Sequence, residues 1–278
     1  MIIDGHAHAC GRYLTPDDII ITLKKSGADK VILVPGESNS KAEYSLPNLA
    51  ALFPRLNVVK VTNFLTKIFI KLSGMIDQIP AGNEYVYTLK QKTNGQVIQF
   101  IWVTTHIQNP IEYLDKKLYE WQFSGVKLHQ VWDNFSIGSE FFYEIALWAE
   151  KNDLPLFIHQ NSDQEVEKII DYKCKHPNLK LIIAHLFGLE LFIKKNCIHQ
   201  NLFFDLSSPQ LVSTKRIYMA LRFIGAQNLI LGSDNPYGKN NLQLNIERIS
   251  RLDIADQDKQ SILGDNLLLI LKKKSRVG

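Results

Sequence analysis

The chain has 278 residues, of which 45% are hydrophobic and 22% charged, a composition typical of a globular protein. Its 32 Lys and Arg residues against 28 Asp and Glu give a net charge of +4, too small and too dispersed to indicate nucleic acid or a membrane as partner. No stretch resembles a secretory signal or a membrane span, and the three cysteines are odd in number and scattered, so a reducing cytoplasm is the expected location.

Eight short apolar segments rich in β-forming residues alternate with amphipathic segments. The strands are expected at Met1–His6, Lys30–Val34, Val97–Val103, Gly125–His129, Pro155–His159, Leu179–His185, Leu202–Leu206 and Asn228–Gly232. Helix signals lie between them, such as a start at Thr15 with a stop at Gly27, and a second helix over Ser139–Asn152. Strands alternating with helices predict a parallel sheet, and no Gly-rich phosphate turn follows the first strand as an open doubly wound sheet would require. The fold class is therefore α/β, a (β/α)8 TIM barrel formed by one domain over residues 1–278.

The region Lys60–Gly82 does not fit this repeat. It falls in the long connection between the second and third strands, and its apolar run Phe64–Leu72 is too short and too charged to span a membrane. We interpret it as an inserted helical segment. A lid over the barrel and a packing helix on its exterior are equally compatible with the pattern.

Residues that bind metals or transfer protons recur at the predicted strand ends. Asp4, His6 and His8 alternate on the first strand and so share one face. Later strands end near His129, His159, His185, Asp205 and Asp234, about one βα repeat apart. Because the strands of a TIM barrel all end at the same mouth, these residues are expected to ring one site.

Several motifs resemble the amidohydrolase superfamily, specifically its amidohydrolase-2 branch of TIM-barrel metal-dependent hydrolases and decarboxylases. The matching segments are Ile3–His8, Gly125–His129, Ile158–His159, Ala184–His185, Gly225–Pro236 and Ile262–Asn266. The similarity extends over nearly the whole chain. It departs from the family pattern where Leu186-Phe187-Gly188 follows His185 in place of a glycine pair.

The residue types and the resemblance together predict a mononuclear metal centre. His6, His8, His159 and Asp234 would hold one divalent ion, with zinc the preferred metal and one position left for water. Such an ion lowers the pKa of bound water from about 15.7 to about 7. The resemblance implies that Asp234 also takes the proton of this water, and His185 is expected to polarise the scissile carbonyl or hold the developing oxyanion.

Two residues keep alternative roles at this stage. Asp4 either orients a ligand imidazole or fills a polar layer of the barrel. Lys127 is expected on the same strand as His129 and on the same face of it. Relatives with two metal ions use a carboxylated lysine on strand four to bridge the ions. It could equally bind a substrate carboxylate, or pair with Asp4 or Asp205 in the barrel core. Resemblance to the mononuclear branch favours one ion, with a second ion bridged by Lys127 as the alternative.

The substrate is expected to be a small molecule bound by residues just beyond the strand ends. The candidates for contact are Arg12, Tyr13, Lys127, His129, Trp132, Asn161, Phe187 and Tyr237. Arg12 would suit an anionic group. The predicted activity is hydrolysis of a C–N or C–O bond in an amide or lactone. A nonhydrolytic decarboxylase is the alternative, and a noncatalytic or nuclease protein on the same scaffold is a third. The expected partners exclude nucleic acid and membranes, while a homodimer is compatible with the sequence.

Overall fold

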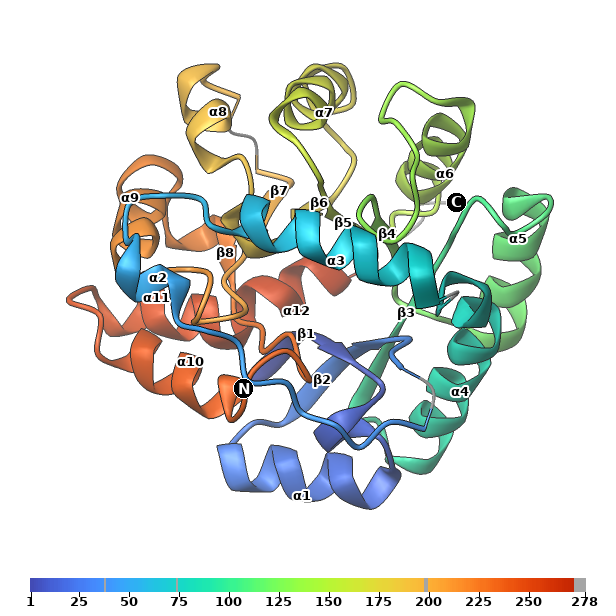
Figure 1. Ribbon diagram of the computed structural model, residues 1–278, viewed down its shortest axis with the longest axis horizontal. Coiled ribbons are helices and arrows are strands. Elements are labelled where there is room, and N and C mark those ends of the chain that lie inside the picture. Colours follow the sequence, from blue (N-terminus) through green and yellow to red (C-terminus); the bar gives the residue numbers. More distant parts are fainter. Residues whose placement is uncertain (38, 74, 198–199, 273–278) are drawn as a thin grey trace.

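Eight parallel strands in the order β1 to β8 form the centre of the protein, and helices surround them (Figure 1). The computed structural model describes residues 1–37, 39–73, 75–197 and 200–272. The strands are β1 (Ile3–His8), β2 (Lys30–Val34), β3 (Val97–Trp102), β4 (Gly125–His129), β5 (Leu156–His159), β6 (Leu181–Ile183), β7 (Leu202–Asp205) and β8 (Leu229–Ile230). Backbone hydrogen bonds join the first strand to the last: Gly5 N donates to Leu231 O at 2.9 Å, and Ser233 N donates to His6 O at 3.1 Å. The predicted (β/α)8 TIM barrel is confirmed.

The helices lie between successive strands and after the last one. They are α1 (Pro16–Ser26), α2 (Leu49–Leu52), α3 (Val59–Ser73), α4 (Ile79–Lys92), α5 (Pro110–Trp121), α6 (Glu140–Lys151), α7 (Asp163–Lys175), α8 (Leu189–Lys194), α9 (Thr214–Ile224), α10 (Asn241–Ser250), α11 (Asp256–Gln260) and α12 (Asn266–Leu271). Two predicted boundaries are confirmed. The Thr15 hydroxyl accepts from Asp18 N ahead of α1, and Gly27 ends this helix in the left-handed conformation at φ 68°. Ser139 caps α6 by accepting from Phe142 N.

The first strand begins later than predicted. It runs from Ile3 to His8 instead of from Met1 to His6, because pairing with β2 starts at Ile3 and continues to His8. Met1 stays half exposed. Both histidines of the first motif therefore belong to the strand, which fixes their backbones in the barrel wall.

Alternation along the strands creates two apolar layers. One fills the barrel and includes Phe100, Trp102 and Phe157, whereas the other packs strand residues such as Ile101 and Ile158 against the helices. Lys127, His129 and Asp205 are buried as well. The polar side chains therefore occupy interior positions that apolar residues fill on neighbouring strands.

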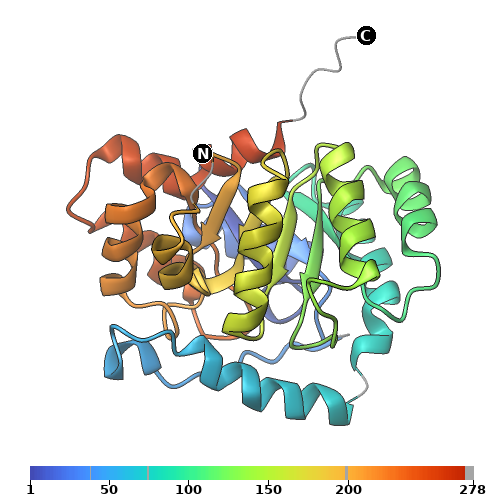
Figure 2. The ribbon, with the colours of Figure 1, turned by 90° about the horizontal axis from the view of Figure 1, so that it is seen from above.

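The connection between β2 and β3 contains α2, α3 and the start of α4. Figure 2 shows α2 and α3 together along one side of the molecule. Within the predicted insertion Lys60–Gly82, Gly74 lies outside the described residues. No helix in the described ranges is both long and apolar enough to cross a membrane.

The three cysteines are free thiols. The sulfur atoms of Cys174 on α7 and Cys197 after α8 nevertheless lie 2.8 Å apart, although 23 positions separate them in the chain.

Candidate metal centre

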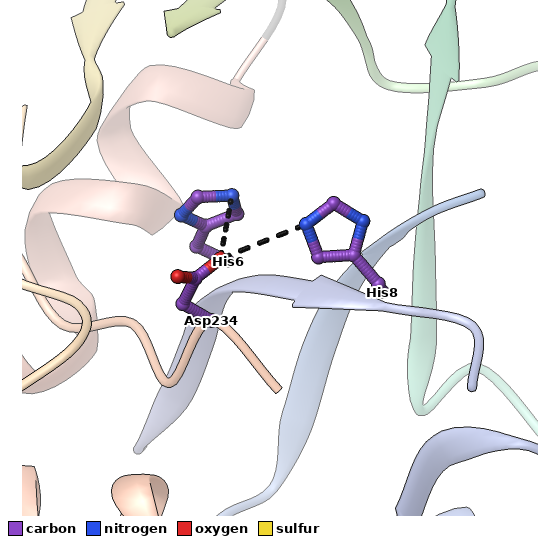
Figure 3. A group of neighbouring side chains, drawn as sticks. All are labelled: His6, His8 and Asp234. Carbon is purple, nitrogen blue, oxygen red and sulfur yellow. Dashed lines mark ion pairs between the residues drawn. The ribbon is translucent and has the colours of Figure 1, made fainter. Parts of the chain in front are cut away.

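Three predicted ligands converge at the mouth of the barrel. Asp234 Oδ1 lies 3.6 Å from His6 Nε2 and 3.6 Å from His8 Nε2 (Figure 3). These atoms form one group of buried ligand atoms that lie within 4.8 Å of one another. Two ligand atoms at about 2.1 Å from a tetrahedral ion are about 3.4 Å apart. The observed separations are too long for hydrogen bonds but fit ligands that share one ion.

Both histidines of β1 present a lone pair to Asp234. His8 Nδ1 donates to the Pro35 carbonyl oxygen at 2.7 Å, because a carbonyl can only accept. His6 Nδ1 lies 3.0 Å from Asp205 Oδ2 and donates to that carboxylate. In the neutral imidazoles the Nε2 atoms are therefore unprotonated. This is the form that binds metals, and the Pro35 and Asp205 contacts are of the kind that orients ligand histidines.

A hydrogen-bonded group connects His185 to the same centre. Ser207 Oγ donates to Asp205 Oδ2 and lies 2.9 Å from His185 Nδ1, so this ring nitrogen donates to the serine. His185 consequently presents Nε2 to the centre, 3.8 Å from Asp234 Oδ2. His185 and Asp234 both adopt left-handed backbone conformations, at φ 56° and 59°. Such backbone strain is uncommon outside glycine and often marks functional positions.

The surroundings favour a charged Asp234 carboxylate and a neutral His6 imidazole. Burial by itself would raise the pKa of Asp234, but His185 and His6 outweigh this effect and hold the pKa below its usual range. Ser208 Oγ also donates to Asp234 Oδ2 at 2.6 Å. Burial lowers the pKa of His6 well below its ordinary value, and Lys127 adds to the effect. Charged oxygen and neutral nitrogen are the ligand states that a divalent cation requires.

Lys127 lies beneath the centre and does not reach the cavity. Its Nζ is 3.2 Å from His6 Nε2 and 3.9 Å from the centroid of the Phe157 ring. Burial lowers its pKa to about 8. The side chain stays in the polar layer inside the barrel and is not among the residues that line the cavity, so its contact with substrate stays a prediction.

Asp4 fills the polar layer, which was one of its two predicted roles. Its carboxylate accepts from Tyr13 Oη at 2.8 Å and from Ser233 N at 2.8 Å, and burial raises its pKa to about 7. No described imidazole contacts it. Asp205 orients His6 instead, because its carboxylate at the end of β7 lies next to that ring.

A cavity of about 100 Å³ opens above the metal centre. It is lined by the predicted His6, His8, His129, Trp132, His159, His185, Asp234 and Tyr237, and by Leu46, Thr62, Asn63, Thr66 and Leu211. Thr62, Asn63 and Thr66 belong to α3, so this helix covers the cavity. Ligand pockets are commonly about 300–1,000 Å³, so this cavity is comparatively small.

His159 is held by the covering helix. Its Nε2 donates to Asn63 Oδ1 at 2.9 Å, while Asn63 Nδ2 donates to Gln160 O at 2.9 Å. The His159 ring stacks on His129 with centroids 4.0 Å apart. His129 Nδ1 accepts from Val131 N at 3.2 Å. His159 lines the cavity but is outside the group formed by His6, His8 and Asp234, so its role as a ligand stays a prediction.

Arg12 and three other predicted contacts lie away from the cavity. Arg12 Nε donates to Glu43 Oε1 at 2.6 Å, in a separate depression that Tyr13 also lines. Phe187 is fully buried in the layer between strands and helices, and Asn161 is not among the lining residues. A loop position beyond a strand thus does not by itself direct a side chain to the mouth.

Sequence reasoning did not assign roles to Asn63, Ser207 or Ser208. The two serines follow Leu206 just beyond the end of β7, a position typical of site residues in barrels. Their position beyond a strand could have identified them as site residues. Asn63 carried no such signal in the sequence, because only the path of α3 brings it to His159.

The sequence model of the amidohydrolase-2 family, described as "Amidohydrolase", matches residues 75–266. The match covers more than half of the chain, and the chain therefore belongs to this family, whose members are metal-dependent enzymes. No curated protein matches the chain in sequence.

Solved structures similar to this chain include enzymes of three kinds. A 4-oxalomesaconate hydratase from Rhodopseudomonas palustris has 15% identity over 98% of this chain and 95% of its own, with a TM-score of 0.64. A 2,6-dihydroxybenzoate decarboxylase from Rhizobium has 13% identity over 97% and 98%, with a TM-score of 0.69. A probable 2-pyrone-4,6-dicarboxylic acid hydrolase from Acinetobacter baumannii has 13% identity over 97% and 98%, with a TM-score of 0.65. At this identity the similarity shows the fold.

Proposed function

We propose that the protein is a metal-dependent hydrolase that cleaves a C–N or C–O bond of a small amide or lactone. The observation that carries this proposal is the convergence of His6 Nε2, His8 Nε2 and Asp234 Oδ1, with both imidazoles in the tautomer that can bind a metal. One divalent ion, preferably zinc, would be held by these residues, with His159 as a further ligand. Bound there, the ion would supply an acidified water and polarise the substrate.

The remaining steps use the side chains around this centre. Asp234 Oδ1 faces both histidines, whereas Oδ2 faces His185 Nε2 at 3.8 Å. Asp234 would take the proton of the attacking water and pass it to the leaving nitrogen or oxygen atom. His185 would take a separate proton from solvent at Nε2 before the substrate reacts, since its Nδ1 proton is directed to Ser207. The resulting imidazolium is a donor for the developing oxyanion, which gives His185 its catalytic role.

The composition of the cavity favours an uncharged scissile group. No Lys or Arg is among the described residues that line it, because Arg12 pairs with Glu43 and Lys127 stays in the barrel.

The alternative is a nonhydrolytic decarboxylase of an unsaturated or aromatic carboxylate. The aromatic walls provided by Trp132 and Tyr237 would suit such a flat substrate.

Two measurements test the proposal. Elemental analysis of protein purified without chelator is expected to give about one divalent ion per chain. Turnover of a panel of amides, lactones and carboxylates in ¹⁸O-labelled water should then place solvent oxygen in the product. Release of carbon dioxide without incorporation of solvent oxygen would replace hydrolysis by decarboxylation. Metal-free protein that binds no zinc on titration would overturn both.

A further inference from the structure

The outer side of the segment that covers the cavity is unusually apolar. Five of the fifteen large apolar side chains exposed in the described residues lie within this short stretch: Leu52 (68% exposed), Phe53 (50%), Leu56 (59%), Val61 (60%) and Phe64 (67%). We call these five residues and Arg55 the α2–α3 face. Concentrated exposure of large apolar groups marks an interaction surface, whereas scattered exposure does not.

The same segment carries positive charge only. Residues 44–76 contain no Asp or Glu, but they include Arg55, Lys60, Lys67 and Lys71, a charge that equals the +4 of the whole chain. Lys60 pairs with Asp163 at 2.6 Å, and Lys67 Nζ donates to Asn134 at 3.1 Å. Arg55 makes no ion pair with any described residue. The charge that looked dispersed by composition is therefore concentrated on one segment.

A neighbouring groove extends the basic surface. This groove of about 470 Å³ is lined by Pro54, Arg55, Lys215, Arg216, Tyr218, Met219, Arg222 and Phe223. Arg216 is paired with Glu190, which leaves the cations of Arg55, Lys215 and Arg222 at the rim. Tyr218 and Phe223 are 41% and 48% exposed. No carboxylate lines the groove within the described part of the chain.

We propose that the α2–α3 face and this groove bind the surface of an anionic phospholipid bilayer. Exposed Phe and Leu side chains beside Lys and Arg are the combination that places a segment at a lipid interface without spanning the membrane. Anionic headgroups complement the cations, and the apolar side chains enter the boundary of the acyl region. A symmetric pairing of two copies through this face would instead oppose like charges, which disfavours a homodimer there. This proposal replaces the sequence-based expectation of no membrane partner.

Sedimentation with phosphatidylcholine vesicles, with and without phosphatidylserine, tests this assignment. The full chain should bind the vesicles that contain phosphatidylserine, and added NaCl should weaken the binding. Arg55→Gln and Lys215→Gln should each reduce the partition coefficient about fivefold, since a cation near such a surface contributes about 1 kcal/mol. The double variant Phe53→Ser/Phe64→Ser should also bind less tightly.

Matched changes on α5 serve as the control. Tyr119 is 88% exposed and Lys116 is exposed, so Lys116→Gln/Tyr119→Ser removes one cation and one aromatic ring elsewhere on the surface. This variant should bind as the unmodified protein does. Equal loss in the control, or no binding of the folded protein to anionic vesicles, would overturn the proposal. Sedimentation analysis that finds a dimer which Phe53→Ser/Phe64→Ser dissociates would overturn it too, and would assign the face to a second copy.

Discussion

The two sides of the barrel mouth hold their histidines in different ways. On the side of β1, β7 and β8, barrel groups fix the imidazoles: Asp205 accepts from His6, and the Pro35 carbonyl accepts from His8. On the side of β4 and β5, His159 is fixed by Asn63 of the covering helix α3. The first side is therefore preorganised by the barrel alone, whereas the second depends on the position of α3.

The largest expected effect comes from removing the carboxylate common to the first side. Asp234→Asn should reduce kcat/KM about 10²–10⁴-fold, because the amide neither takes a proton nor carries the charge that binds the ion. Metal content should fall in parallel. Steady-state kinetics with elemental analysis measure both. Unchanged turnover by a folded Asp234→Asn protein would remove Asp234 from the mechanism.

A smaller loss is expected from the residue that orients His6. Asp205→Asn should weaken metal binding or activity about 10–100-fold, the range seen when the partner of a ligand histidine is changed. Asp4→Asn is the matched control, since Asp4 is an equally buried carboxylate that contacts Tyr13 and not an imidazole. Zinc titration of both variants compares them. Equal losses in metal affinity would show that burial of charge matters and orientation does not.

The backbone on the first side leaves no room for a larger residue at Gly232. A Cβ there would lie 2.4 Å from Asp205 Oδ1 and 2.9 Å from His6 Cβ. Gly232→Ala should destabilise the fold by about 1–3 kcal/mol, as overpacking does, and should displace Asp205 from His6. Gly138→Ala is the control, because its nearest neighbour is 4.0 Å away. Denaturant unfolding of both variants gives the difference, and equal stabilities would contradict the crowding argument.

A change on the second side of the mouth, at Asn63, should alter the pH dependence of kcat/KM. Burial lowers the pKa of His159 well below its ordinary value. Asn63→Ala removes the Asn63 contact and admits water, so the pKa should rise toward about 6.5. Because the imidazole then protonates earlier as the pH falls, the acid limb of kcat/KM should move to higher pH. The loss at neutral pH should be about fivefold, equivalent to one hydrogen bond.

A second contact of α3 provides the control for this experiment. Asn134 accepts from Lys67 outside the cavity, so Asn134→Ala loosens α3 without touching His159. Its pH profile should match that of the unmodified protein. An identical shift in both variants would mean that any loosening of α3 suffices, and Asn63 would then have no specific role.

Local sequence signals predicted the barrel because they act over one element at a time. The alternation of apolar residues gives the strands, and Thr15 with Gly27 gives the ends of α1. The spacing of polar residues at strand ends also predicted that His6, His8 and Asp234 lie at the same mouth of the barrel. The same rule predicted Arg12 at the mouth, but Arg12 pairs with Glu43 away from the cavity. Glu43 lies in the connection after β2, and no periodicity in the sequence describes the path of that connection.

The sequence by itself determined the barrel, through its alternation of strand and helix segments, and the inward direction of His6 and His8, through the two-residue repeat of a strand. It also determined the ligand types at the mouth, through the residues that stand at the strand ends. Only the tertiary structure decided that Asp205 and not Asp4 orients His6, and that α3 covers the cavity and contacts His159 through Asn63. It also decided that the α2–α3 face points outward. These outcomes depend on contacts between segments far apart in the chain. Loop paths and crossings between layers set such contacts, and no local pattern encodes them.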